Sequence, residues 1–83
     1  MANARADLID ALAKHIGVSP LTPAEIDCVL ELAAVAAHGT GDRTSAPLAS
    51  FLAGIAARDA PDRIASVDQI RQHTAELTAT SDA

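Results

Sequence analysis

Apolar residues recur along the chain at the spacing of helix faces, and no segment shows the sustained alternation of a strand. The first stripe comprises four aliphatic residues, Leu8, Ile9, Leu12 and Ile16. It predicts a helix over residues 4–16, which Gly17 ends as a left-handed cap and against which Val18 can pack back. A short linker follows this first helix.

A strong start signal predicts a second helix over residues 23–38. Thr22 can cap this helix, Pro23 suits its first position, and Glu25 completes a capping box. Its apolar face comprises Ile26, Val29, Leu30, Ala33 and Ala37. Since the second half carries a single charged residue, Glu31, the helix is apolar nearly all round. We therefore expect it at the centre of the fold.

The third predicted helix, over residues 45–58, is apolar on two sides. Its large stripe comprises Leu48, Phe51, Leu52 and Ile55, and its small side comprises Ala49, Ala53, Gly54 and Ala57. A glycine inside a helix costs about 1 kcal/mol relative to alanine. The close approach of another helix to Gly54 would explain that cost.

A fourth helix is predicted over residues 62–78, and its apolar face is thin. That face comprises Ile64, Val67, Ile70, Thr74 and Leu77, among alternating charges. Two interpretations remain open at this point. The helix either closes the bundle over the first three helices or projects and binds a partner.

These elements predict an all-α fold, a compact antiparallel bundle of four short helices joined by short connections. We expect a single helical domain over residues 1–78 and a frayed tail over residues 79–83. Much of the apolar content of this 83-residue chain is alanine, and its one aromatic residue is Phe51. The core of such a chain is marginal, which favours a homo-oligomer or docking to a larger protein.

Charge and cysteine content exclude several classes of function. The net charge is −5 and Lys14 is the only lysine, which argues against nucleic acid and against a polybasic membrane patch. No apolar run is long enough for a membrane helix, and the N-terminus lacks the pattern of a signal peptide. We therefore expect a cytoplasmic protein. The lone Cys28 excludes an internal disulfide framework.

The sequence offers little catalytic chemistry. The three histidines, His15, His38 and His73, lack the spacing of helical metal ligands, so we predict no metal site. Cys28 has neither a base nor a cation beside it in sequence, and we interpret it as a small buried core residue. No nucleophile elbow or phosphate-binding loop is present. We predict a protein that is not an enzyme and has no cofactor.

One constellation of polar residues predicts a binding site for a small anion or a partner's carboxylate. It comprises His38, Gly39, Arg43, Thr44 and Ser45, around the start of the third helix. Helix N-termini attract anions, and an arginine offers a fork of donors to phosphate or carboxylate. The structural alternative has glycine for the turn, Ser45 as a cap, and Arg43 paired with Asp42 or a helix C-terminus.

The same region carries a family resemblance. The matching segments are 36–39 (Ala-Ala-His-Gly), Arg43, 46–48 (Ala-Pro-Leu), 51–52 (Phe-Leu) and Gly54. Across about residues 26–57 the chain resembles a family of small helical proteins of unassigned function, common in actinobacteria. Thr44 stands where that family often has proline. The resemblance implies a companion of the guanylyltransferases of the molybdenum cofactor pathway, either beside them or fused to them.

The interpretation that we favour is a non-enzymatic protein-interaction module or small accessory subunit. Its setting would be molybdenum cofactor maturation or a molybdoenzyme complex. The interface candidates are Leu32, Val35, Ala49, Phe51, Ala53 and Gly54, chiefly the small-residue side of the third helix together with the second. The alternative function is a binding domain for a phosphorylated cofactor or anion at the 38–45 loop.

Overall fold

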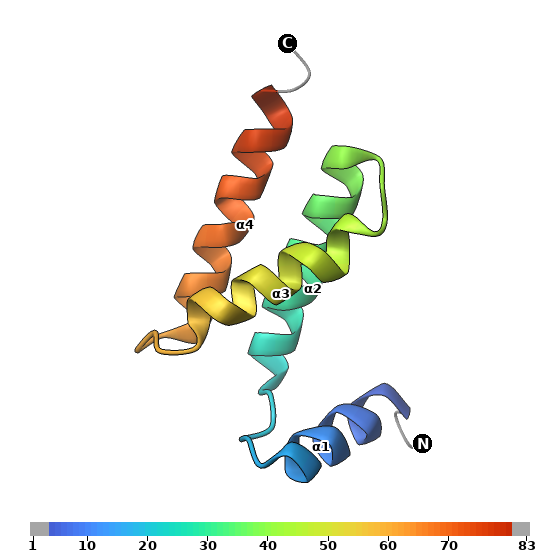
Figure 1. Ribbon diagram of the computed structural model, residues 1–83, viewed down its shortest axis with the longest axis vertical. Helices are drawn as coiled ribbons and strands as arrows, with labels where there is room; N and C mark the ends of the chain where they lie inside the picture. Colours follow the sequence, from blue (N-terminus) through green and yellow to red (C-terminus); the bar gives the residue numbers. More distant parts are fainter. Residues whose placement is uncertain (1–3, 81–83) are drawn as a thin grey trace.

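The computed structural model describes residues 4–80, which form four helices and no strand (Figure 1). The helices are α1 (Ala4–Ile16), α2 (Pro23–Thr40), α3 (Ser45–Ala57) and α4 (Arg63–Thr80). The predicted all-α fold is confirmed. Helix α4 runs through Thr80, into the segment expected to be a tail, and residues 81–83 lie outside the described residues.

Both ends of α2 follow from local chemistry. Thr22 Oγ1 accepts a hydrogen bond from the Glu25 backbone N–H at 3.1 Å, and Glu25 Oε1 accepts one from the Thr22 N–H at 2.8 Å. This capping box satisfies two amide groups that the first helical turn leaves unpaired. At the other end, Gly41 has φ +71° and donates its N–H to Ala37 O, which closes the helix.

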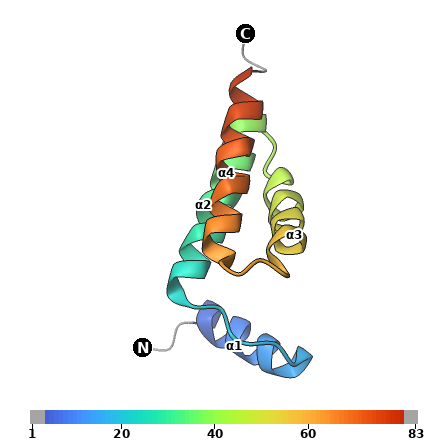
Figure 2. The same ribbon diagram turned by 90° about the vertical axis from the view of Figure 1, so that its left-hand side faces the viewer.

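Helices α2, α3 and α4 form one packed unit, in which α3 connects two helices that run in the same direction (Figures 1 and 2). Contacts at both ends hold α2 alongside α4. Cys28 Sγ donates to Ile64 O at 3.6 Å near the helix starts. Near the helix ends, a Cβ built on Gly39 would lie 2.6 Å from the Thr78 side chain. The fourth helix therefore packs on α2 and α3 and does not project, although it does not cover α1 as the prediction of a four-helix bundle required.

The core of this unit is small. Its buried residues are Leu32, Ala53, Ala57 and Val67, and the half-buried Cys28, Val29, Ala49 and Ile70 pack against them. Leu32 is the one large side chain that is fully buried among the described residues. Alanine removes little apolar surface from water, so a core of this composition stabilises the fold weakly.

Helix α1 lies outside the packed unit, below the start of α2 (Figure 1). Its one buried residue is Ala13, whose carbonyl accepts a hydrogen bond from the Val18 N–H at 2.9 Å. The projecting helix contributes to an elongated shape, with extents of 44 × 31 × 18 Å. Across residues 4–80, no helix has the length and apolar character required to cross a membrane.

Candidate interaction surface

Helix α3 buries its small residues and exposes its large ones. Ala53 and Ala57 lie in the core, and Ala46 and Ala49 are half-buried on the same side of the helix. The outer face of α3, by which we mean Leu48, Phe51, Leu52 and Ile55, is between 59 and 71% exposed. At about 100° of rotation per residue, the outer face lies roughly opposite the buried alanines. The helix therefore presents its bulkiest side chains to solvent.

The alanine side faces inward because α3 packs on both α2 and α4. Small side chains let helix axes approach closely, and the leucine and phenylalanine side chains of α3 are too large for the same space. This arrangement leaves most of the apolar surface of the outer face uncovered by the rest of residues 4–80.

A second exposed apolar stripe lies on α1. Leu8, Leu12 and Ile16, which we call the α1 stripe, are 50 to 63% exposed. The half-buried Ile9 instead lines a cavity of about 160 Å³ together with Leu21, Ile26, Val29 and Leu30 of the linker and α2. Figure 2 shows α1 extending to the same side of α2 and α4 on which α3 lies.

The exposure of α3 corrects part of the predicted interface. Leu32 and Ala53 are buried within the three-helix unit, so they belong to its core and cannot contact a partner. Val35 and Ala49 are half-buried, whereas Phe51 and Gly54 are exposed. The large stripe of α3, and not its small-residue side, is the surface available to another molecule.

The structure divides the predicted anion site into two parts. His38 and Gly39 lie near the end of α2 and line an open groove of about 490 Å³, where Ala75 and Thr78 of α4 form the opposite wall. Arg43 does not line that groove. The candidate residues of the 38–45 loop therefore do not converge on one pocket.

The chain's own Asp42 accepts hydrogen bonds from the start of α3. Asp42 Oδ1 accepts from the Thr44 N–H at 2.9 Å and from Thr44 Oγ1 at 2.7 Å. These hydrogen bonds, the side-chain one foremost, hold the pKa of Asp42 below its ordinary value. The Ser45 hydroxyl lies 2.9 Å from Thr40 Oγ1. The Thr44 donors that an external anion could use are therefore already engaged within the loop.

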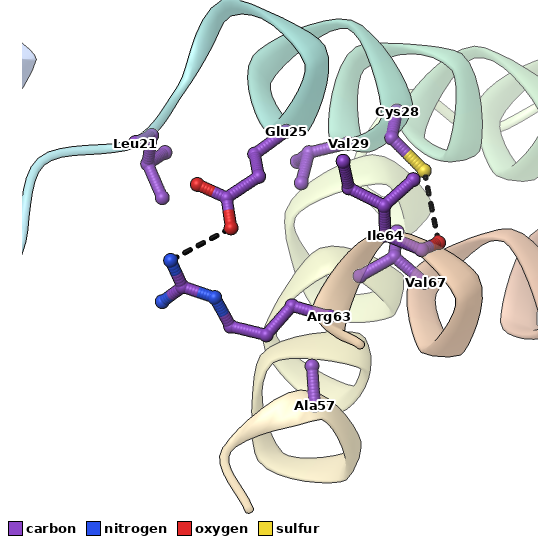
Figure 3. Close-up of a pocket in the computed structure, with 8 residues that line it drawn as sticks. All are labelled: Leu21, Glu25, Cys28, Val29, Ala57, Arg63, Ile64 and Val67. Carbon is purple, nitrogen blue, oxygen red and sulfur yellow. Dashed lines mark hydrogen bonds and ion pairs between the residues drawn. The ribbon is translucent and has the colours of Figure 1, made fainter. Parts of the chain in front are cut away.

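A small cavity between α2 and α4 is lined by one thiol and two charged side chains, those of Cys28, Glu25 and Arg63 (Figure 3). Its volume is about 100 Å³, and its lining includes Cys28, Val29, Ile64 and Val67. Arg63 Nη2 and Glu25 Oε2 form an ion pair at 2.7 Å beside it.

The surroundings of Cys28 disfavour its thiolate form. Burial, aided by the carboxylates of Asp68 and Glu31, raises the pKa of the thiol, and the cation of Arg71 only partly opposes them. A raised pKa keeps the sulfur in its unreactive protonated form near neutral pH. Within residues 4–80, no three or more His, Cys, Asp or Glu side chains gather as they would around a metal ion.

Fold and surface together define a small helical domain with a thin alanine core and an exposed face of large apolar residues. The chain belongs to a family described as a domain of unknown function, DUF6457, whose model matches residues 2–83. Comparison with curated proteins and with solved structures gave no match.

Proposed function

We propose that this chain is a non-enzymatic interaction module, a small accessory subunit that associates through exposed apolar helix faces. The outer face of α3 is the observation that carries the proposal. Its four side chains, Leu48, Phe51, Leu52 and Ile55, are each more than half exposed. Monomeric proteins rarely leave contiguous apolar patches larger than a few hundred Å² in contact with water.

The free energy available from covering this surface is substantial. Full burial of a large apolar side chain is worth about 1.5–3 kcal/mol, and somewhat less here because each is already partly covered. The outer face of α3 and the α1 stripe together provide seven such side chains. Their burial would contribute roughly 7–14 kcal/mol, comparable with the roughly 4–15 kcal/mol that association costs. A specific complex through these helices is therefore energetically feasible.

We further propose that the larger partner belongs to molybdenum cofactor maturation in the cytoplasm, either a guanylyltransferase or a molybdoenzyme complex. The resemblance over about residues 26–57 supports this setting. An apolar docking surface, in place of a catalytic constellation, is what an accessory subunit of such an enzyme requires.

Isothermal titration calorimetry of the full chain against a molybdenum cofactor guanylyltransferase from the same genome tests the proposal. We expect binding by the wild type and by Leu77→Glu, a control that places the same charge at an exposed leucine of α4. A chain carrying Leu12→Glu together with Leu52→Glu should lose binding, with unchanged helix content by circular dichroism. Absence of binding by the wild type would refute the molybdenum setting. A wild type that also stays monomeric at all concentrations would refute the interaction module itself.

Binding of a phosphorylated cofactor at the 38–45 loop is the weaker candidate, because Asp42 already accepts the Thr44 donors. A thermal shift with guanine nucleotide that disappears in Arg43→Ala would favour it over the interaction module. We expect no such shift.

A further inference from the structure

The outer face of α3 is distinguished from the other helix surfaces by its lack of charge. No Asp, Glu, Lys, Arg or His occurs between Ser45 and Ala57, whereas each of the other helices carries both acidic and basic residues. We propose that this face is the contact between two copies of the chain, with the two α3 helices packed across a two-fold axis. This inference rests on the proposed function and names the partner that covers this particular face.

Charge favours a second copy as the partner. In a two-fold contact the same patch appears on both sides, so any charged residue near the axis would face its own copy. The chain has a net charge of −5, and two copies repel each other at most of their surfaces. The uncharged α3 is where that repulsion is smallest. A partner attracted by opposite charge would find no charged side chain on this helix.

The spacing of the large residues also suits a helix pair. Leu48, Phe51, Leu52 and Ile55 are separated by three, one and three positions, which places them along one side of the helix. Side chains at this spacing form the ridges and holes by which two helices interdigitate. Two copies of α3 can therefore pack with the same residues acting as knobs and as holes.

Gly54 supplies an independent observation. Glycine destabilises a helix interior relative to alanine, and nothing within residues 4–80 requires it, because a Cβ at Gly54 would meet no atom of these residues within 4 Å. Gly39 differs, since the Thr78 side chain leaves no room for a Cβ there. At about 100° of rotation per residue, Gly54 borders the outer face next to Phe51 and Ile55, so a second copy packed close to those two residues would account for a glycine at this position.

The area is sufficient for a weak dimer. Large apolar side chains each remove about 60–120 Å² from water when fully covered, and those of the outer face are already about one third covered, so the outer faces of two copies would bury roughly 300–650 Å². Stable interfaces begin near about 1,000 Å² of total buried surface. We therefore expect a weak dimer with a dissociation constant above about 10 µM, and the α1 stripe remains available for a larger partner.

Sedimentation velocity of the purified full chain, from roughly 1 µM to roughly 500 µM, brackets a micromolar constant and tests the proposal. The wild type should pass from monomer to dimer over this range. Leu52→Glu should weaken the dimer by about 100-fold or more, because it buries an unpaired charge beside its own copy. The control Leu77→Glu adds the same charge on α4 and should change the constant by less than about threefold.

Gly54→Ala separates the proposed contact from the stability of the monomer. The added methyl group meets open space within the chain, so it should raise the unfolding temperature at low concentration. The same methyl group should weaken the dimer about tenfold, because it fills the space reserved for the second backbone. This variant also keeps the test valid if Leu52→Glu does not fold.

A wild type that remains monomeric at the highest concentration would overturn the inference, and so would a dimer equally sensitive to both glutamate variants. A dimer that is unaffected by both Leu52→Glu and Gly54→Ala would mean that the contact lies elsewhere on the chain. That result would also overturn the inference. If the wild type stays monomeric yet binds the guanylyltransferase, the proposed function survives and only the second copy is refuted.

Discussion

Leucine-to-alanine substitutions on α2 and α3 should have very unequal consequences for the stability of the monomer. Leu32 is fully buried, whereas Leu52 is 64% exposed. Leu32→Ala leaves a cavity in a core whose other buried members are Ala53, Ala57 and Val67, and such substitutions cost about 2–5 kcal/mol. A domain of this length has a total stability of roughly 4–12 kcal/mol. The variant should therefore lose a large part of its stability or fail to fold.

Leu52→Ala should change the free energy of unfolding by no more than about 0.5 kcal/mol, because the side chain is mostly in water and alanine has the higher helix propensity. Urea unfolding followed by far-ultraviolet circular dichroism measures both variants. The protein concentration should be about 1 µM, below the dissociation constant expected for the dimer, so that association contributes little. Leu48→Ala, on the same exposed face, is the matched control and should behave like Leu52→Ala.

Equal losses at Leu32 and Leu52 would refute the orientation of α3 described above, since they would mean that both side chains are buried in the monomer. A larger loss at Leu52 would refute it more strongly. A change in the urea dependence of unfolding would instead indicate an altered unfolded state, and the comparison would then rest on Leu48→Ala.

Three further predictions concern the caps and the thiol. Cys28 should react with iodoacetamide more slowly in the folded protein than in urea at the same pH, because its pKa is raised by burial; equal rates would contradict this. Glu25→Gln keeps an acceptor for the helix cap but loses the Arg63 ion pair, so it should lower the free energy of unfolding in urea by less than about 1 kcal/mol. Glu25→Ala loses both interactions and should lower it by more. Since the pKa of Asp42 is lowered in the folded state, its stabilising effect is present above the ordinary carboxyl pKa and is lost as the pH falls below about 4. Thr44→Val removes the side-chain donor to Asp42, so its free energy of unfolding should fall less than that of the wild type between about pH 5 and about pH 3. Identical pH profiles for the wild type and Thr44→Val in urea unfolding would contradict a lowered pKa of Asp42.

Helix starts were predictable wherever the signal is local. Thr22, Pro23 and Glu25 lie next to one another, and their capping box needs no distant residue. The end of α2 was less predictable. The helix continues through Gly39 to Thr40, and the close approach of Thr78 from α4 accompanies that extension. Periodicity within α2 carries no information on that distant contact.

The rotation of α3 could not be predicted from periodicity, because the helix is apolar on two sides. Phe51 and Ala53 lie on roughly opposite faces, and either face satisfies an amphipathic pattern. The choice depends on how α3 packs against α2 and α4, where Ala53 and Ala57 are buried together with Leu32 and Val67. The expectation that the small-residue side of this helix faces a partner was therefore wrong, since Ala53 and Ala57 are buried.

The loop after α2 illustrates a different limit. His38 and Arg43 are close in sequence, yet His38 lines a groove against α4 and Arg43 does not. Hydrogen bonds inside the loop, above all those from Thr44 to Asp42, use donors that the sequence offered to a ligand. The residue types predicted which hydrogen-bond donors this loop contains. They did not predict which of those donors would bond to acceptors within the loop itself.

The central claim is that the outer face of α3 is exposed in the isolated chain and becomes covered on association. Carbene footprinting with mass spectrometry measures this at the level of single residues. At about 1 µM, Phe51 and Leu52 should be labelled strongly and Leu32 hardly at all, and labelling of α3 should fall as concentration rises or a partner is added. Protection of Phe51 and Leu52 at the lowest concentration, or labelling that never changes, would contradict the account.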